Sequence, residues 1–337
     1  MEPPFITVLI TGYNRKQFIR DAIQSYKDQI SSVSRELIVI TNFSDNEIDE
    51  FVTSAGGQSI SIGECGVGEM LYTGITHSKG EIIMFLDDDD YFANDKIEVV
   101  GKLLKSDPSI IFVHNAQTFV DDGKRPVVDR RIALNDNIQF SLNDFNLRNE
   151  LKRIPINDFV KIQFNLSSIT IRKNAYSRYL TALREIRGHT DDFFFYSALS
   201  SGGNFKIFFT VQQETVYRIH ESTSYIKNGN TTKRTEKALL DYVYSTNSIY
   251  KLVNGSQISG IILYRYFSEM FDLAIATGQF RKLSEEFRIS VKGCKIVLNW
   301  FKILPVKSFL YVLRRYLHAQ FYILFSIKTA GLRQSAD

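Results

Sequence analysis

The chain has 337 residues, of which 44% are hydrophobic and 23% are charged, as in an ordinary soluble globular protein. Its two cysteines, Cys65 and Cys294, are too few and too far apart for a disulfide framework or a zinc site, so we expect a cytoplasmic location. The formal charge is +4, but residues 281–337 hold 11 Lys and Arg against 3 Asp and Glu, a net charge of +8. Residues 1–280 therefore carry a net charge of −4, and the positive charge belongs to the C-terminal region.

The first 115 residues alternate between predicted strands and helices. Apolar runs predict strands at residues 5–10, 36–41, 58–62, 81–86 and 109–114, and helix-like spacing predicts helices at residues 16–29, from about 44, and 94–105. This alternation is typical of βαβ units, which build a parallel sheet with right-handed crossovers. The sequence therefore predicts an α/β half of the nucleotide-binding type.

Four carboxylates, Asp87 to Asp90, directly follow the strand predicted at residues 81–86. The five apolar residues before them suit a strand that is buried on both faces, and parallel sheets present ligands at the carboxyl ends of their strands. Packed carboxylates repel one another unless a cation is bound, and a hard divalent cation carrying a phosphorylated ligand is the natural partner. A solvated acidic loop that caps the next helix is the alternative.

The alternation weakens beyond residue 115. Residues 121–165 are polar and mixed, and we expect loops and short pieces there; residues 222–234 predict a mobile loop. Strands are expected at residues 165–172, 205–210 and 215–220. One helix is expected to follow the first of these strands and end near residue 187, and a second to start near residue 190. From residue 236 onward only helices are expected.

Large apolar and aromatic side chains alternate with basic ones near the C-terminus. Arg314 and Arg315 interrupt the longest uncharged segment, which is shorter than the ~18 residues that a membrane-spanning helix requires. The pattern favours an interfacial amphipathic helix on a membrane surface; a helical subdomain with an aromatic core is the alternative. Nucleic-acid binding is not expected, because the basic residues alternate with apolar ones and not with polar linkers.

Three blocks of the N-terminal half resemble glycosyltransferase family 2, whose members have the GT-A fold. The blocks are V-L-I-T-G-Y-N-R-K-Q-F-I-R-D-A-I-Q-S at 8–25, E-L-I-V-I-T-N-F-S-D at 36–45 and K-G-E-I-I-M-F-L-D-D-D-D-Y at 79–91. The resemblance covers residues 5 to about 220 and implies a Rossmann-like α/β sandwich with a mainly parallel sheet, followed by a C-terminal helical region. It divides the chain into a nucleotide-sugar-binding half (1–115), an acceptor-binding and catalytic half (116–225), and a helical, basic, potentially membrane-associating region (236–337).

The resemblance also implies a donor site at the strand ends. Asp87 and Asp89 correspond to the D-x-D pair, with Asp87 facing the ribose and Asp89 a Mg²⁺ or Mn²⁺ ion. His220, in the segment Y-R-I-H-E-S-T-S, completes the metal shell, and Arg218 lies near the phosphates. The remaining donor-binding residues are Thr11 and Tyr13 at the nucleobase, together with Arg15, Asn42 and Asp88. Thr41, Asn42 and Met70 to Tyr72 depart from the family pattern, so UDP is expected but dTDP and GDP stay open.

An inverting transferase needs a carboxylate to take the proton of the acceptor hydroxyl. The family places this base at the start of a helix about a hundred residues after the D-x-D pair, which here is the segment G-H-T-D-D-F-F-F-Y. Asp191 or Asp192 is therefore the candidate, and Asp191 is preferred. A frame shifted by two residues would place His189 and Thr190 there, and helix capping by Thr190 and Asp191 is the alternative.

Together these features predict a metal-dependent glycosyltransferase of the hexosyltransferase type (EC 2.4). It would move a sugar from a UDP-sugar to a hydroxyl of a glycan or lipid-linked acceptor, as in cell-surface polysaccharide synthesis, in the cytoplasm or on the inner face of the cell membrane. One alternative is a catalytically inactive nucleotide-sugar-binding module, favoured by the changes at Thr41 and Leu71. Another is a nucleotidyltransferase, for which T-G-Y-N-R-K is a poor triphosphate loop.

Overall fold

The computed structural model describes residues 3–127, 136–220, 225–228, 231–287, 296–298, 300–302 and 304–334. The chain divides into two compact units. The N-terminal unit comprises Met1–Phe145 and Ile162–His220, and the C-terminal unit comprises Asn146–Lys161 and Glu221–Asp337. Residues 146–161 thus group with the helical end of the chain, although they fall within the segment predicted to bind the acceptor. The functional roles predicted for 1–115 and 116–225 stay predictions.

Within the described residues, the strands of the N-terminal unit form one nine-stranded sheet in the order β3-β2-β1-β4-β8-β6-β9-β5, with β7 on β9. The pairs β1–β2, β1–β4, β2–β3 and β6–β9 are parallel. The strands β8, β5 and β7 run antiparallel to their partners. The strands are β1 (Ile6–Gly12), β2 (Arg35–Thr41), β3 (Gln58–Ser61), β4 (Ile82–Asp87), β5 (Tyr91–Phe92), β6 (Ile110–Asp121), β7 (Ile138–Ser141), β8 (Ile169–Arg172) and β9 (Lys206–Ile219).

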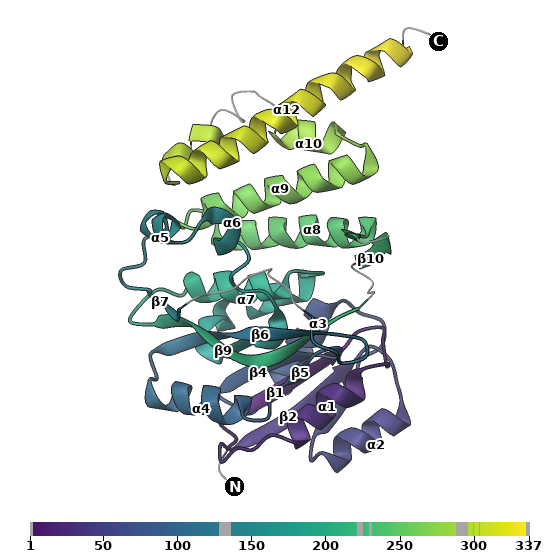
Figure 1. Ribbon diagram of the computed structural model, residues 1–337, viewed down its shortest axis with the longest axis vertical. Coiled ribbons are helices and arrows are strands. Elements are labelled where there is room, and N and C mark those ends of the chain that lie inside the picture. The colour runs from purple at the N-terminus through teal and green to yellow at the C-terminus, as the bar shows by residue number, and fades with distance from the viewer. Residues whose placement is uncertain are drawn as a thin grey trace. The chain divides into compact units, whose positions relative to one another are not determined.

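Helices cover both faces of this sheet (Figure 1). On one face, α1 (Ile19–Lys27), α2 (Asn46–Ser54) and α4 (Lys96–Ser106) share a core cluster with Val8, Met84 and their neighbours. On the other face lie α3 (Val67–His77) and α7 (Thr190–Leu199), where the ring of Phe194 packs 4.4 Å from that of Phe85. Since successive side chains of a strand point to opposite faces, the apolar run of β4 fills both cores. The predicted α/β sandwich is confirmed.

Residues 116–220, which the two units share, differ from the predicted elements in four places. The strand expected at 165–172 begins only at Ile169, and Leu166–Ser168 before it form a 3₁₀ segment. The strands expected at 205–210 and 215–220 are one strand, β9, because the exposed polar residues between them form a bulge against β6. The helix expected before residue 187 consists of two 3₁₀ segments, Lys173–Ala175 and Ser177–Glu185. The segment expected to be irregular contains the end of β6, β7, and two short helices, α5 (Leu147–Arg153) and α6 (Ile156–Phe159).

The C-terminal unit is helical, as predicted. Besides α5 and α6 it contains α8 (Glu236–Val253), α9 (Ser259–Thr277), α10 (Arg281–Phe287) and α12 (Val306–Gln334). Its core is aromatic: the ring of Phe267 contacts those of Phe287, Trp300 and Tyr316, and the buried indole of Trp300 donates to the carbonyl of Gly260 at 3.1 Å. Part of the aromatic stripe is therefore ordinary core. None of the helices, within their described residues, is both long and apolar enough to span a bilayer.

Of the mobile loop predicted at 222–234, residues 222–224 and 229–230 lie outside the described residues. The rest forms a small antiparallel hairpin of β10 (Tyr225–Asn228) and β11 (Thr231–Arg234). The sequence of this segment has no apolar periodicity, which is why the hairpin was not predicted.

Candidate active site

Two of the predicted donor residues, Thr11 and Asp87, lie at the carboxyl ends of the neighbouring strands β1 and β4. Thr11 is opposite Asp87 in the parallel register, and its hydroxyl donates to Asp87 Oδ1 at 3.4 Å. The backbone N–H of Asp87 donates to Ser167 Oγ at 3.0 Å. The apolar residues of β4 are buried, and the strand ends at Asp87. The carboxylates that follow therefore gather at the edge of the sheet formed by the carboxyl ends of its parallel strands.

Arg15, in the loop after β1, is the centre of this group. Its Nε and Nη2 donate to the two carboxylate oxygens of Asp88, both at 2.8 Å, and Nη2 also lies 2.6 Å from Asp89 Oδ2. Its Nη1 is 3.0 Å from Nε2 of His220, the residue that follows β9. Although burial lowers the pKa of Arg15, the hydrogen bond to Asp88 and the charge of Asp89 raise it overall. A permanent cation is therefore held among these acids.

Asp89 joins this group to His220. Its Oδ2 lies 2.8 Å from His220 Nε2, and the imidazole packs against the ring of Phe18 with a centroid separation of 5.0 Å. Phe18 was not predicted as a site residue. Its buried position at the start of α1 could have been inferred from helix periodicity, but its contact with a histidine 202 positions later depends on the fold.

The carboxylates differ in their charge. Burial raises the pKa of Asp87 well above its usual range and that of Asp88 to about 6. Burial also raises the pKa of Asp89, but the hydrogen bond with His220 and the charge of Arg15 lower it overall. Asp89 is thus the carboxylate that stays anionic most readily, and it is also the one that contacts both Arg15 and His220.

Asp90, the last acid of the run, is an internal anchor. It is almost fully buried, and its oxygens accept from the backbone N–H of Arg218 at 3.0 Å and from Asn165 Nδ2 at 2.6 Å. Burial raises its pKa to about 7. Asp90 therefore ties β9 to the loop before β8 and supports the group formed by its neighbours.

Arg218 is placed differently from the other predicted donor residues. Its buried guanidinium pairs with Asp21 of α1 at 2.6 Å and lies 4.2 Å from the ring centroid of Phe18. The contact with the phosphates that was predicted for Arg218 stays a prediction. Asp21 was not predicted, because its partner is far away in the sequence.

Asn42 shapes the loop that carries the predicted nucleobase residues. Its Oδ1 accepts from the backbone N–H of Asn14 at 2.8 Å, and its Nδ2 donates to Asn14 Oδ1 at 2.6 Å. Asn14 has a φ of 56°, a left-handed conformation that asparagine tolerates better than most residues. These two hydrogen bonds fix the conformation of the loop between the half-buried side chains of Tyr13 and Arg15.

A family model matches this chain. The family model described as Glycosyl transferase family 2 matches residues 7–180, which is more than half of the chain. The chain belongs to glycosyl transferase family 2. The match includes every predicted donor residue except Arg218 and His220, which follow it.

The proteins that this family 2 chain resembles match it over different shares of their length. A protein of Haemophilus influenzae named as an uncharacterized glycosyltransferase is 28% identical over 112 residues, which are 33% of this chain and 38% of the relative. Among solved structures, residues 1–349 of S. aureus TarS in complex with UDP-GlcNAc give a TM-score of 0.57 at 12% identity, over 96% of this chain and 92% of that one. A longer TarS chain is covered to 54%, with a TM-score of 0.55. The matches thus cover less than two thirds of the Haemophilus protein and of the longer TarS chain. The likeness to the TarS fragment confirms the predicted GT-A fold.

The candidate catalytic bases of this family 2 chain form a second group on α7. His189 precedes the helix with a φ of 56°, and Asp191 in the first turn is half-buried. Asp192 is fully buried, accepts from Gln163 Nε2, and has one oxygen 3.5 Å from His189 Nδ1. The two neighbouring acids therefore differ: Asp191 reaches solvent, whereas Asp192 is enclosed by protein groups.

Among the described residues, His189, Asp191 and Asp192 offer ligand atoms within 4.8 Å of one another, close enough to hold a metal ion. This group was not predicted as a metal site, and His189 entered the prediction only through the frame-shifted alternative for the base. The predicted metal ligands, Asp89 and His220, belong to the group around Arg15. Acids and an imidazole thus meet in this group on α7 as well as in the group around Arg15.

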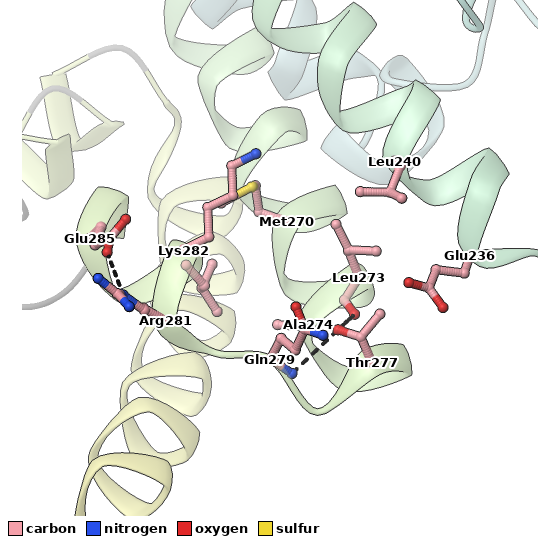
Figure 2. A pocket seen from close by; sticks show the side chains of 11 residues that line it. Glu236, Leu240, Met270, Leu273, Ala274, Thr277, Gln279, Arg281, Lys282 and Glu285 are labelled. Atoms are coloured by element: carbon pink, nitrogen blue, oxygen red, sulfur yellow. Dashed lines mark hydrogen bonds and ion pairs between the residues drawn. The ribbon is translucent and has the colours of Figure 1, made fainter. Parts of the chain in front are cut away.

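A hollow of about 470 Å³ lies among α8, α9 and α10 in the C-terminal unit (Figure 2). Leu240, Met270 and Leu273 are apolar residues of its wall, and at its rim Arg281 pairs with Glu285 at 3.0 Å. No predicted site residue lines it, and the two acids among its lining residues, Glu236 and Glu285, belong to the C-terminal unit and not to the sheet that carries the predicted donor residues.

Proposed function

We propose that this chain is an inverting glycosyltransferase that moves a sugar from a nucleoside diphosphate sugar to a hydroxyl of a glycan or lipid-linked acceptor. The observation that carries the proposal is the convergence of Thr11, Arg15, Asp87 to Asp89 and His220 at one edge of the sheet, linked by the contacts described above. A phosphorylated ligand fits this edge, because it presents a permanent cation and acids suited to a metal–phosphate complex.

The donor would lie across the ends of β1 and β4. In this proposal Thr11, Tyr13 and Asn42 line the nucleobase, and Asp87 binds the ribose. Arg15, with Asp88 holding it in position, approaches the diphosphate. Arg218 would join it at the phosphates. We propose UDP as the nucleotide; the TarS fragment with a similar fold was solved with UDP-GlcNAc and with UDP.

A divalent cation fits Asp89 and His220. A carboxylate oxygen and an imidazole nitrogen, 2.8 Å apart in this structure, are donors that Mg²⁺ or Mn²⁺ accepts, and bound phosphate oxygens and water would complete the shell. Such an ion, when bound, stabilises the negative charge that develops on the departing diphosphate. Arg15 contacts the same two atoms, so its guanidinium must move towards the phosphates when the ion binds.

Asp191 is the proposed catalytic base. Its half-buried carboxylate in the first turn of α7 can take the proton of the acceptor hydroxyl as that oxygen forms a bond to the anomeric carbon. The bond between the anomeric carbon and the diphosphate oxygen breaks on the opposite side, so the configuration inverts. Asp192, buried against Gln163 and His189, would position the start of the helix.

The acceptor and the cellular place of the reaction belong to the same proposal. We infer an acceptor used in cell-surface polysaccharide synthesis and a position in the cytoplasm at the inner face of the membrane. The support is the basic C-terminal region, whose net charge is opposite in sign to that of residues 1–280.

An inactive nucleotide-sugar-binding module is the second candidate. Leu71 replaces a basic residue of the family pattern and is fully buried in α3, so α3 supplies no cation there. Such a protein would bind the donor without turnover.

The test is release of UDP from a panel of UDP-sugars, with Mn²⁺ and with candidate acceptors, by the wild-type chain and by Asp89→Asn. Loss of one group that stabilises the departing charge should slow transfer by about 100-fold or more. Asp107→Asn is the matched control, because Asp107 pairs with Lys206 at 2.8 Å outside the site. Donor binding without turnover would favour the binding module, and full activity of Asp89→Asn would overturn the assignment.

A further inference from the structure

Helix α12 has two distinct faces in its described part. One face packs on the C-terminal unit: Val312, Tyr316 and Ala319 are buried, and the hydroxyl of Tyr316 donates to the carbonyl of Phe287 at 2.8 Å. Gln320 donates to the same carbonyl at 2.8 Å. These contacts fix which face of the helix points outward.

The outward face carries large apolar side chains. Val306, Leu310 and Leu317 are 62%, 55% and 52% exposed, and their spacing of four and seven residues places them on one stripe of the helix. Phe301, just before the helix, is 57% exposed and its ring lies 5.1 Å from that of Phe309. A contiguous exposed apolar stripe of this kind marks an interaction surface.

Basic side chains border this stripe. Lys307, Arg314 and His318 are exposed on the same side of the helix. Tyr311, Arg314, Arg315 and His318 line a hollow of about 340 Å³, whose phenol, guanidinium and imidazole groups suit a phosphate. Arg315 pairs with Asp272 of α9 at 2.7 Å, whereas the sequence offers Lys307 and Arg314 no local acid, because it contains no Asp or Glu between Glu286 and Asp337.

We propose that the outward face of α12 docks on an anionic phospholipid bilayer. Val306, Leu310 and Leu317 enter the boundary between headgroups and acyl chains, while Lys307 and Arg314 bind lipid phosphates. This combination of an apolar stripe with flanking cations is the chemistry of an interfacial helix. The inference deepens the membrane location proposed above by naming the surface and its ligand.

The charges argue against the other occupants of such a face. A two-fold pairing of two copies would bring identical basic borders together, at an electrostatic cost. A nucleic acid would neutralise the cations but leave the apolar stripe in water. A bilayer with anionic headgroups satisfies both parts of the surface.

Flotation of the full chain with phosphatidylcholine vesicles, with and without phosphatidylglycerol, tests this proposal. The wild-type chain should float with the anionic vesicles and not with the neutral ones. Leu310→Ser combined with Leu317→Ser, and separately Arg314→Glu, should each weaken binding by about tenfold or more. The matched controls, Ile275→Ser on α9 and Arg281→Glu on α10, change exposed residues elsewhere in the unit and should bind as the wild type does.

The emission of Trp300, which is buried in the core of the same unit, checks that each variant is folded. Equal binding to both kinds of vesicle, no binding, or wild-type binding by the α12 variants would overturn the proposal. So would a dimer in light scattering that the leucine variant abolishes, or RNA binding that Arg314→Glu abolishes without any binding to vesicles. Flotation is measured without a nucleotide sugar, so its failure is distinct from failure of the transferase assay.

Discussion

Replacement of Arg15 by methionine tests the proposal that its guanidinium contacts the same carboxylate and imidazole atoms that would bind the divalent metal ion. Methionine keeps most of the apolar stem but removes the charge that contacts Asp88, Asp89 and His220. The wild-type chain would lose this internal pairing when a divalent ion binds Asp89. The variant has no pairing to lose, so the ion should stabilise the variant more than the wild type.

The contacts set the magnitude. The Asp88 carboxylate is 6% exposed and that of Asp89 is 21% exposed, whereas Arg15 is 25% exposed. Removing one partner of a buried pair costs about 3–5 kcal/mol, and partial exposure places this case near the lower end, at about 3 kcal/mol. An ion at a hundred times its dissociation constant restores about 2.7 kcal/mol, which would offset most of the loss.

The assay is urea unfolding followed by circular dichroism, with and without Mn²⁺, for the wild type, Arg15→Met and Arg184→Met. Arg184 pairs with Glu69 at 2.7 Å on the surface of the same unit and is the matched control, expected to change stability by less than about 1 kcal/mol. A loss in Arg15→Met no larger than that of the control would refute the reasoning. Equal stabilisation of wild type and Arg15→Met by Mn²⁺ would also refute it.

Three further changes probe other parts of the N-terminal unit. Burial lowers the pKa of Lys96 from its ordinary 10.5 to about 7, despite nearby Glu214 and Asp90, so the unfolded chain binds one more proton between these pH values and stability rises with pH there. Urea unfolding of Lys96→Met from pH 7 to 9 should lack this slope of about 1.4 kcal/mol per pH unit; identical slopes in the two proteins would contradict the assignment. Gly68→Ala should lower the unfolding temperature by several degrees, because a Cβ there would collide with the backbone carbonyls of Leu183 and Ile186; an unchanged melting curve would show that this contact yields. Asp191→Asn should lose transfer while donor titrations stay normal, and Asp192→Asn should chiefly lose stability; a folded, donor-binding but inactive Asp192→Asn would move the base to Asp192.

The sheet edge could be predicted because its signal is local. Five apolar residues followed by acids describe a buried strand that ends at a ligand site, and no distant partner is needed to recognise it. The α/β class and the succession of the first strands along the chain follow in the same way. The resemblance to a family then extended these local signals to residues such as His220.

What could not be predicted depends on contacts between distant segments. Asp90 appears in the sequence as one of four equal acids, but its buried partners Asn165 and Arg218 come from other strands and loops. The pairing of Arg15 with Asp88 and of Arg218 with Asp21 likewise needs the folded sheet. No periodicity contains that information.

The C-terminal region shows a different limit. Helix α12 is rich in apolar residues on all sides, so its sequence does not separate Tyr316, which is core, from Leu310 and Leu317, which are exposed. Contacts in the folded unit, such as those of Tyr316 with Phe267 and with the carbonyl of Phe287, reveal the outward face.

Isothermal titration of UDP into the wild-type chain and into Asp89→Asn, each with and without Mn²⁺, tests the central claim most directly. We expect Mn²⁺ to strengthen UDP binding to the wild type, and Asp89→Asn to lose this dependence because the ion has lost a ligand that contacts His220. Failure of the wild type to bind UDP, dTDP or GDP with either Mg²⁺ or Mn²⁺ would contradict the claim. An unchanged dependence on Mn²⁺ in Asp89→Asn would remove Asp89 from the metal site.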